Sequence, residues 1–389
     1  MKVILSVDAV RHPLTGIGRY VYELARHLPQ VDPSLDLRLF AGGRFIGSLP
    51  GDASASGPAE AGTRRRARRL HDALQASTLA RRVHHAWLAR RQARALAGHA
   101  DAVYHGPQFY LPAFAGPAVA TIHDLSVFSW AHCHPRGRAA LLRREIRTAL
   151  DRARLIVTDS EFTRRELAAF AGFPADRIRT VPLAAGAEFR PRQPGELAPA
   201  LQALGLQADG YCLFAGTIEP RKNIVALIDA YRMLPAALRT RFPLVLTGYR
   251  GWRSEAIHAQ IEQAAGEGWL RYLGYRPAQE LPLLFAGARL FAFPSHYEGF
   301  GLPVLEAMAS GVPVVCSTSS SLPEVAGGAA ASCPPEAVDA LAALLARGLD
   351  DAGWREQARA SGLANAARYS WRRCAEQTLA VYREAERAP

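Results

Sequence analysis

Residues 293–308 of this 389-residue chain read Phe-Pro-Ser-His-Tyr-Glu-Gly-Phe-Gly-Leu-Pro-Val-Leu-Glu-Ala-Met. An apolar run enters a loop that holds Gly299 and Gly301, and Pro303 then stands where a helix would begin. Proline suits the first helical turn because the N–H that it lacks would have no partner there. Gly311 is expected to end the helix. The stretch therefore predicts a strand, a glycine loop and a helix.

Two carboxylates flank this predicted helix start, Glu298 on the loop and Glu306 in the first helical turn. Unpaired backbone N–H groups and the helix dipole favour an anion there, and Gly299 and Gly301 let the backbone come close to it, so we expect a diphosphate site. Ionised carboxylates accept hydrogen bonds from hydroxyl groups. One acid can thus hold hexose hydroxyls and the other ribose hydroxyls, unless Glu306 only complements the helix dipole.

Short apolar runs and helical stretches alternate on both sides of this segment, which is typical of α/β units with parallel sheets. The expected strands are 2–8, 35–40, 102–105, 118–122, 155–159 and 180–182, then 211–215, 244–248, 270–273, 290–293 and 312–315. The expected helices include 19–28, 138–152, 223–233, 254–265 and 303–310. Prolines in 187–199 suggest a linker. Two α/β series joined in this way predict two lobes with a cleft between them, where ligands bind at the carboxyl ends of the strands.

The segment SHYEGFGLPVLEAMASGVPVV, with seven residues between Glu298 and Glu306, resembles the E-x7-E signature of family 4 glycosyltransferases, and the resemblance extends over nearly the whole chain. It implies the GT-B fold, with two Rossmann-like lobes whose parallel sheets face each other across a cleft. We expect an acceptor lobe over 1–187, a nucleotide-sugar lobe over 188–370, and a helix over 371–389 that crosses back to the first lobe. The resemblance also implies that Glu298 contacts the donor sugar and Glu306 the ribose.

The same resemblance implies transfer of a hexose with retention at the anomeric carbon. The nucleotide-sugar is then a substrate rather than a cofactor, and neither a cofactor nor a divalent metal is expected. His132 and His134 flank Cys133, but adjacent loop positions rarely converge on one ion and no matching ligand pair follows, so no metal site is expected there.

A second segment, Ala-Gly-Thr-Ile-Glu-Pro-Arg-Lys-Asn over 215–223, follows a predicted strand and opens a helix. A lysine there can neutralise charge on a departing diphosphate. The resemblance assigns this role to Lys222, with Arg221 beside it. Many family members carry an arginine just after the glycine, where this chain has Thr217, so the source of a second cation stays open.

Two further segments carry candidate residues. A glycine-containing loop over 15–20 follows the first strand, and although such a loop often marks only a tight turn, in the family it faces the donor phosphates and the acceptor. His123 ends a predicted strand and is followed by Asp124. A lone histidine is often structural, but this position and the resemblance favour a role in positioning the donor sugar. The turn over 159–162 is expected to be structural.

The candidate site is the following set of residues. The catalytic candidates are His123, Arg221, Lys222 and Glu298, and the candidates for donor binding are Gly16, Gly18, Arg19, Gly216, Thr217, Gly299, Phe300, Gly301, Leu302, Glu306 and Glu324. Glu324 belongs to a stretch, 321–325, that resembles one close to the nucleotide-sugar.

The formal net charge of +12 indicates an anionic partner. Ten arginines lie between residues 63 and 99 against one acid, Asp72, and apolar residues including Trp87 recur among them at three- and four-residue steps. This pattern predicts one or two basic amphipathic helices that could lie on an anionic membrane surface. The alternative is a solvated arginine face packed on its own domain.

The expected location is the cytoplasm, with peripheral attachment to the inner face of the cytoplasmic membrane. No apolar run is long enough to span a bilayer, and the first residues do not form a signal peptide. The five cysteines are scattered and odd in number, which favours reduced thiols.

The segments AGTIEPRKN and SSSLPEVAGGAA most resemble the mannosyltransferase-like branch that builds bacterial surface polysaccharides. This suggests mannose or a deoxy-mannose as the sugar, a GDP-sugar as the donor and a lipid-diphosphate-linked glycan as the acceptor. A UDP-sugar donor is the first alternative. A nucleotide-sugar epimerase fits the spacing of the two glutamates poorly, and a nucleic-acid-binding protein lacks a base-reading motif, so no nucleic acid is expected as a partner.

Overall fold

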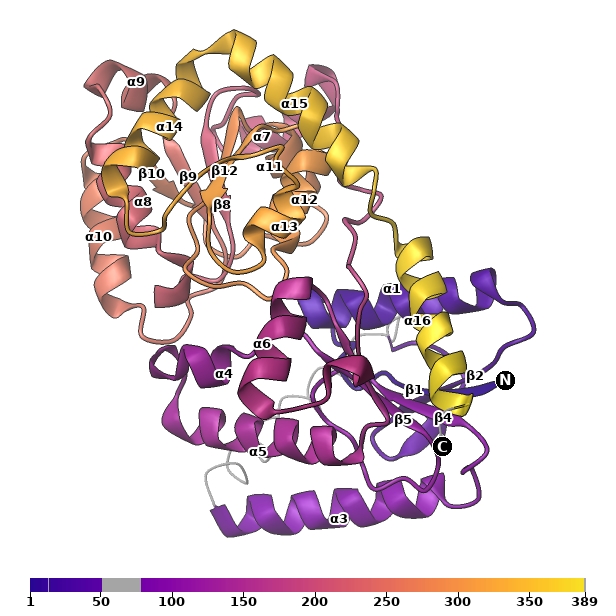
Figure 1. The fold of residues 1–389 in the computed structure, drawn as a ribbon. Helices are drawn as coiled ribbons and strands as arrows, with labels where there is room; N and C mark the ends of the chain where they lie inside the picture. The colour runs from indigo at the N-terminus through magenta and orange to yellow at the C-terminus, as the bar shows by residue number, and fades with distance from the viewer. Residues whose placement is uncertain (13, 51–77, 388–389) are drawn as a thin grey trace, which may run out of the picture.

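The computed structural model describes residues 1–12, 14–50 and 78–387, and two parallel sheets organise them. The first sheet has the strand order β3-β2-β1-β4-β5-β6-β7 and the second β10-β9-β8-β11-β12-β13. Figure 1 shows the second sheet and its helices stacked above the first. All strand neighbours are parallel except β2 and β3, and the GT-B fold is confirmed.

The strands are β1 (Lys2–Ser6), β2 (Asp36–Ala41), β3 (Arg44–Ile46), β4 (Val103–Gly106), β5 (Ala118–Ile122), β6 (Leu155–Thr158), β7 (Ile178–Thr180), β8 (Cys212–Ala215), β9 (Leu244–Thr247), β10 (Leu270–Tyr272), β11 (Leu290–Phe293), β12 (Val314–Ser317) and β13 (Ala331–Cys333). The helices are α1 (Gly16–Val31), α3 (Thr78–Leu96), α4 (Ser126–Ser129), α5 (Arg136–Arg152), α6 (Glu161–Ala171), α7 (Pro194–Ala203), α8 (Ile224–Arg232), α9 (Ala236–Arg241), α10 (Glu255–Gly266), α11 (Leu281–Ala286), α12 (Leu302–Ala309), α13 (Leu322–Ala326), α14 (Val338–Asp350), α15 (Ala352–Ala366) and α16 (Trp371–Arg387).

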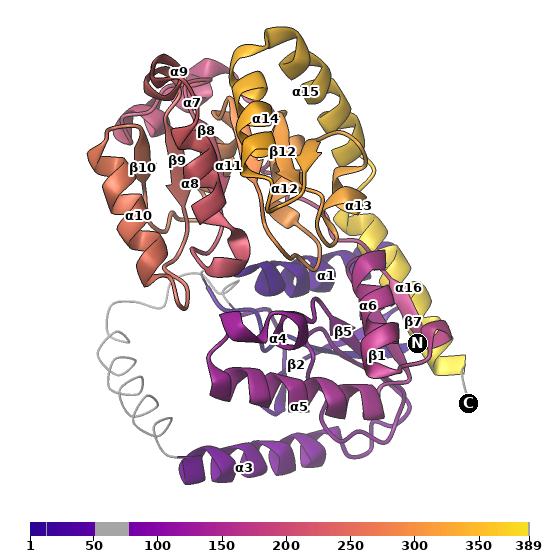
Figure 2. The same ribbon diagram turned by 60° about the vertical axis from the view of Figure 1, so that its left-hand side comes forward.

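The first sheet is covered on both faces, and its central strands β4, β5 and β6 are buried at every position. Along β1, Val3 and Leu5 face the layer of α1 and α16, whereas Ile4 faces the layer that includes α3 and α5. The period-two alternation of a strand sends successive side chains to opposite faces, so two separate cores form. In Figure 2, α1, α4 and α6 lie at the edge of this lobe that faces the second lobe.

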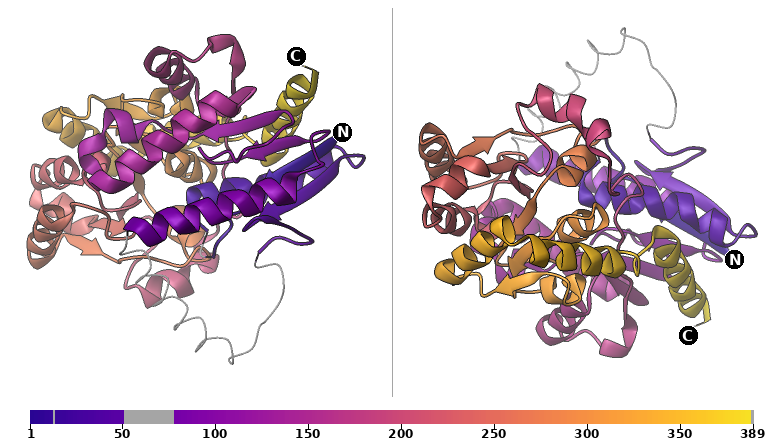
Figure 3. Two further views of the ribbon diagram at one scale, coloured as in Figure 1. Left: turned by 90° about the horizontal axis from the view of Figure 1, so that it is seen from below. Right: turned by 90° about the horizontal axis from the view of Figure 1, so that it is seen from above.

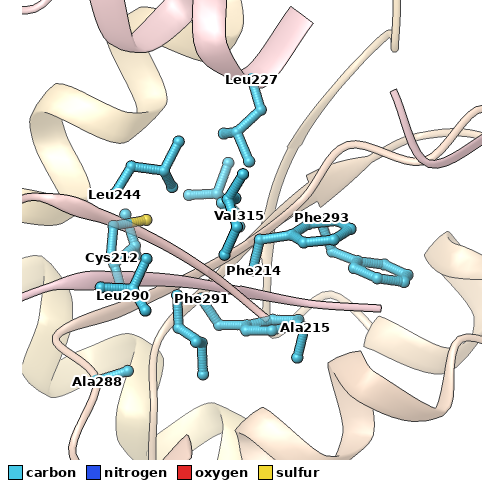
Figure 4. Packing of buried hydrophobic residues seen from close by; sticks show 14 of the residues in the cluster. Cys212, Phe214, Ala215, Leu227, Leu244, Ala288, Leu290, Phe291, Phe293 and Val315 are labelled. Atoms are coloured by element: carbon cyan, nitrogen blue, oxygen red, sulfur yellow. The ribbon is translucent and has the colours of Figure 1, made fainter. Parts of the chain in front are cut away.

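The second sheet is buried in one continuous core. Figure 4 shows Phe214, Phe291 and Phe293 from β8 and β11 packed together, with successive ring centroids 5.7 Å apart. Aromatic pairs at this separation add stabilisation beyond the area that they bury. This packed core supports the loops that follow β8 and β11.

The last helix, α16, returns to the first lobe. It packs against α1 and along β4, β5 and β6, with Trp371 and Tyr382 buried. Apolar residues of the second lobe, among them Phe300 and Leu305, join the same cluster. The two lobes are therefore joined by apolar contacts as well as by covalent connections.

Several expected elements differ in the structure. Strands β3 and β13 were not predicted, and each spans only three residues. The linker expected over 187–199 ends early, because Pro194 occupies the first turn of α7 and the Glu196 side chain accepts a hydrogen bond from the backbone N–H of Gln193 at 3.2 Å.

The arginine-rich segment expected over 63–99 lies only partly within the described residues. Residues 63–77 fall outside them, and α3 begins at Thr78. The end of α3 packs on the first lobe through Gln92 and Leu96, whereas Trp87 is 53% exposed. Figure 3 (left) shows α3 on the outer side of the first lobe, away from the second. Within the part of the chain that the structure describes, no helix could span a membrane.

Candidate functional site

The loop between β11 and α12 forms the centre of the candidate site. Gly301, directly before α12, has φ +103°, a conformation that side chains rarely adopt, and no side chain caps the helix. The helix N-terminus is thus open to an anionic ligand. Glu306 lies in the second turn of α12 rather than the first, because the helix begins at Leu302.

Glu298, Arg221 and Lys222 form a buried cluster at the carboxyl ends of β8 and β11. Lys222 Nζ donates to Glu298 Oε1 at 2.6 Å, and Arg221 Nη1 donates to Glu298 Oε2 at 3.4 Å. Arg221 Nη2 donates in turn to Glu219 Oε1 at 2.7 Å. The structure thus brings the three predicted residues together, and Glu219 is an addition that the sequence analysis missed.

The backbone conformation of the segment after β8 sets the positions of Arg221 and Lys222. Residues Pro220–Lys222 form a short 3-10 helix, and Asn223 follows in the left-handed region with φ +55°. The Asn223 amide nitrogen donates to the carbonyls of Pro294 at 3.1 Å and Pro335 at 2.7 Å. Asparagine tolerates this conformation better than most other residues with side chains. Asn223 therefore both ends the segment 215–223 and, through its side-chain amide, anchors it to the loop that follows β11.

The charges in the cluster support one another. Burial raises the pKa of Glu298, but the charges of Lys222 and Arg221 outweigh it and hold that pKa below its ordinary value. Burial lowers the pKa of Lys222 against the opposing pull of Glu298. An ionised carboxylate beside two cations is a strong acceptor for sugar hydroxyls.

Glu306 has the opposite environment. No donor among the described residues hydrogen-bonds its carboxylate, and burial raises its pKa from 4.5 to about 7, with Arg19 opposing and Glu188 adding to the rise. Arg19 reaches across from α1, and its Nη2 lies 2.8 Å from Glu188 Oε1. A carboxylate left without donors at the cleft is suited to a ligand that brings hydroxyl groups.

The glycine loop before α1 serves two purposes. Thr15 caps the helix, since its Oγ1 accepts from the N–H of Gly18 at 3.2 Å. A Cβ on Gly18 would lie 2.9 Å from the Ala9 carbonyl oxygen, so packing requires glycine there. A Cβ on Gly16 would meet nothing within 4 Å, so the space beside Gly16 is open.

His123 lies at the carboxyl end of β5. Its Nδ1 lies 2.7 Å from Asp159 Oδ2 and its Nε2 3.1 Å from the Pro107 carbonyl oxygen. Burial lowers the pKa of His123, but the Asp159 carboxylate raises it above the ordinary value. Both ring nitrogens are thus engaged, one by a carboxylate and one by a carbonyl, so neither is free to act as a general base in this geometry.

Gly299 makes a close backbone approach between the lobes. A Cβ on this residue would lie 1.9 Å from the carbonyl oxygen of His123. The Gly299 carbonyl also accepts hydrogen bonds from Ser160 Oγ at 2.6 Å and Thr163 Oγ1 at 3.2 Å. Only glycine fits here, and the 159–162 turn, expected to be structural, forms part of this interface.

Glu324 lies apart from the cluster. Its two carboxylate oxygens accept hydrogen bonds from the backbone N–H groups of Glu161 and Phe162, at 2.9 and 3.1 Å. Those groups begin α6 on the first lobe, where a negative charge complements the helix dipole. In this arrangement Glu324 joins the lobes.

The remaining candidates lie around these groups. Gly216 and Thr217 follow β8, and the Gly216 N–H donates to the Thr247 carbonyl at 2.9 Å. Phe300 is buried in the apolar cluster shared by the lobes, and Leu302 opens α12. Apart from Thr217, the side chains of these residues are apolar or absent, so they shape the loops through packing and backbone conformation.

Tyr297 is a residue that sequence reasoning missed. Its hydroxyl donates to Glu166 Oε2 at 2.5 Å and accepts from the Leu125 N–H at 2.9 Å, both on the first lobe. Its place beside Glu298 was visible in the sequence. Its partners were not, because they lie more than a hundred positions away.

Comparison with known proteins finds that this chain is similar to glycosyltransferases. The family model described as Glycosyltransferase Family 4 matches residues 14–185, and the model described as Glycosyl transferases group 1 matches 202–365. The chain is 44% identical over 388 residues to O-antigen chain mannosyltransferase B of Escherichia coli, covering 98% of this chain and all of that protein. It is also 34% identical over 226 residues to the serotype-specific mannosyltransferase WbdA of Escherichia coli, of which it spans 28%.

Solved structures share the fold at low sequence identity. The crystal structure of WaaG, a glycosyltransferase involved in lipopolysaccharide biosynthesis, superposes with a TM-score of 0.70 at 15% identity and covers 98% of this chain and 99% of that one. Anabaena HepE in complex with UDP and glucose gives a TM-score of 0.71 at 17% identity, with 99% and 100% covered.

Proposed function

The chain belongs to glycosyltransferase family 4 and is a hexosyltransferase, and on that premise we propose that it transfers mannose, or a deoxy-mannose, from a GDP-sugar to a growing, lipid-linked surface polysaccharide of the O-antigen type. The observation that carries this proposal is the end-to-end similarity to an O-antigen chain mannosyltransferase. The charge arrangement around α12 is consistent with it.

The donor diphosphate is proposed to bind at the N-terminus of α12. No side chain caps the start of this helix at Gly301, so no side chain competes with such a ligand for the helix N-terminus. Lys222 and Arg221 lie beside this point and can neutralise the charge that develops on the leaving diphosphate. A metal ion is not needed for that task in this proposal.

The two glutamates are proposed to hold the two sugars of the donor. Glu298, kept ionised by its cations, would accept hydrogen bonds from the transferred hexose. Glu306, which has no donor of its own, would accept those of the ribose. His123 would help to position the hexose from the opposite lobe, and it would not act as a base because both of its ring nitrogens are already paired.

We propose retention at the anomeric carbon by attack on the face from which the diphosphate leaves. The acceptor oxygen forms the new bond as the sugar–phosphate bond breaks, and the departing diphosphate takes the hydroxyl proton. No carboxylate of the cluster is free to act as a nucleophile, since Glu298 is held by two cations. Anomeric coupling constants of the product would test this, because an inverted product excludes it.

Donor identity is tested by nucleotide binding. Thermal shifts with GDP-mannose, GDP, UDP-glucose and UDP should show stabilisation by the GDP compounds alone, weakened in Glu306→Ala. Stabilisation by the UDP compounds alone would replace the donor and keep the chemistry. No stabilisation by any of the four would refute the proposed donor site.

A lipid-linked acceptor would account for the arginine-rich segment 63–99. Within the described part of this segment, 78–99, helix α3 exposes Arg90 and Arg94 near Trp87. We therefore propose peripheral attachment to the inner, anionic face of the cytoplasmic membrane. Co-sedimentation should show binding to phosphatidylglycerol vesicles but not to phosphatidylcholine vesicles, and equal, negligible binding to both would refute it.

A further inference from the structure

A cavity of about 550 Å³ opens on the second lobe at the end opposite the donor site. Its lining includes Asp209, Arg289 and Pro313, which precede β8, β11 and β12, so it lies at the amino ends of the strands. The linker before α7 and the helices α7, α11, α12 and α15 surround it, and these helices lie side by side in Figure 1. The proposed transfer reaction uses none of these residues.

The cavity is strongly basic. Its lining holds five arginines against three acids, namely Arg190, Arg192, Arg289, Arg355 and Arg359 against Glu196, Asp209 and Glu356. Arg190 and Arg192 share Glu196, and Arg289 pairs with Asp209. The acids therefore do not satisfy the full set of cations.

Among the five arginines that line the cavity, Arg359 is the one to which the described residues offer no hydrogen bond or ion pair. It projects from α15 over Gly311, where its Nε lies 3.3 Å from the place that a Cβ would occupy. That position holds the guanidinium against the end of α12, at the wall of the cavity. A guanidinium so placed presents a planar fork of donors to an incoming anion.

Two further polar groups lack partners. Ser310, which ends α12 and lines the cavity, is 3% exposed, and its hydroxyl has no hydrogen-bond partner in the described structure. The Nε of Arg192, on the linker side, is also buried without a partner. Buried polar groups are nearly always paired, and both of these groups are free to donate to a ligand that enters the cavity.

We propose that this cavity binds the phosphate group of a small phosphorylated compound, with Arg359, Arg192 and Ser310 as its donors. A phosphate has enough oxygen acceptors for both guanidinium groups and the hydroxyl together. The volume exceeds that of a phosphate ion and leaves room for a sugar-sized group beside Pro191 and Leu197. The inference is independent of the identity of the donor sugar.

The test is a titration of the full chain at constant ionic strength with inorganic phosphate and, separately, with mannose 6-phosphate, followed by calorimetry. We expect binding of at least one of them, weakened about tenfold or more in Arg359→Ala, the usual effect of losing a charge-assisted hydrogen bond. Arg359 is exposed on α15, so the variant should fold. Arg372→Ala, an exposed arginine of α16, is the matched control and should bind as the parent does.

The two ligands distinguish the source of the phosphate. Tighter binding of mannose 6-phosphate assigns the cavity to a phosphorylated sugar, and equal binding assigns it to the phosphate group alone. Either result supports the site if the variant Lys222→Ala, which is altered only at the donor site, still binds the same ligand. Absence of binding, equal binding by Arg359→Ala, or loss of binding in Lys222→Ala would overturn the proposal.

Discussion

Replacing Glu306 by glutamine is expected to stabilise the free protein at pH 8 and to change its stability little at pH 5. Folding raises the pKa of this carboxyl from 4.5 to about 7, chiefly through burial. The unfolded chain therefore releases the proton at a lower pH than the folded chain. The stability that the protonated carboxyl contributes is present at low pH and is lost as the pH rises towards 7.

The magnitude follows from the two pKa values. At pH 8 the buried charge costs about 3 kcal/mol, and at pH 5 less than about 1 kcal/mol, if the unfolded carboxyl is ordinary. Glutamine removes this cost because it stays neutral. For a chain of this size the gain corresponds to a rise in Tm of about 4 °C at pH 8.

Differential scanning calorimetry of both proteins between pH 5 and 8 measures the effect. Glu262→Gln, which alters an exposed glutamate of α10, is the matched control and should show no pH-dependent difference. A Tm difference independent of pH, or a lower Tm for Glu306→Gln at pH 8, would refute the burial argument.

Nucleotide affinity should change with pH in the opposite direction to stability, rising as Glu306 ionises. If ribose hydroxyls donate to the ionised carboxylate, nucleotide affinity of the parent falls below pH 7, by up to about tenfold for each further pH unit. Glu306→Gln should bind more weakly at pH 8 and lose this pH dependence, as calorimetric titration with the nucleotide can show. Affinity that is constant from pH 5.5 to 8 in the parent would contradict this role.

Three further substitutions probe the cluster and the interface. Lys222→Ala should lower kcat about a hundredfold or more, since it removes the cation proposed for the leaving group, and steady-state assays showing near-parental turnover would contradict that role. Gly299→Ala should push the lobes apart, because its Cβ would lie 1.9 Å from the His123 carbonyl oxygen; small-angle scattering should show a larger radius of gyration, whereas Gly16→Ala, in open space, should not. Glu324→Gln should destabilise the protein by about 1 kcal/mol through loss of charge at a helix N-terminus, and an unchanged Tm would argue against it.

The elements that could be predicted from sequence are those with strong local signals. Pro303 and the glycines before it mark the start of α12, and the apolar runs of β8 and β11 stand out because both faces of those strands are buried. Strands β3 and β13 could not be predicted, since three residues are too few to show a period. Pro194 was misread as part of the linker because proline is equally suited to a linker and to a first helical turn.

The site was predictable in its composition but not in its contacts. The spacing of Glu298 and Glu306 and the Arg221–Lys222 pair mark a site, yet the ion pairs between the two segments depend on how β8 and β11 pair in the sheet. Glu324 illustrates the limit of local patterns, since its partners at the start of α6 lie more than 160 positions away and on the other lobe.

The return of α16 to the first lobe means that the chain passes between the lobes twice, after β7 and again between α15 and α16. Two anchor points define a line, and a rotation about that line strains neither crossing, whereas a twist about any other direction pulls on one of them. We therefore expect the cleft to open by a hinge rotation about the axis through the two crossings. Such a rotation would bring Gly299 and His123 back to the same relative position each time the cleft closes. Cutting the chain before Trp371 would leave a single covalent connection between the lobes, and the axis of their rotation would no longer be defined.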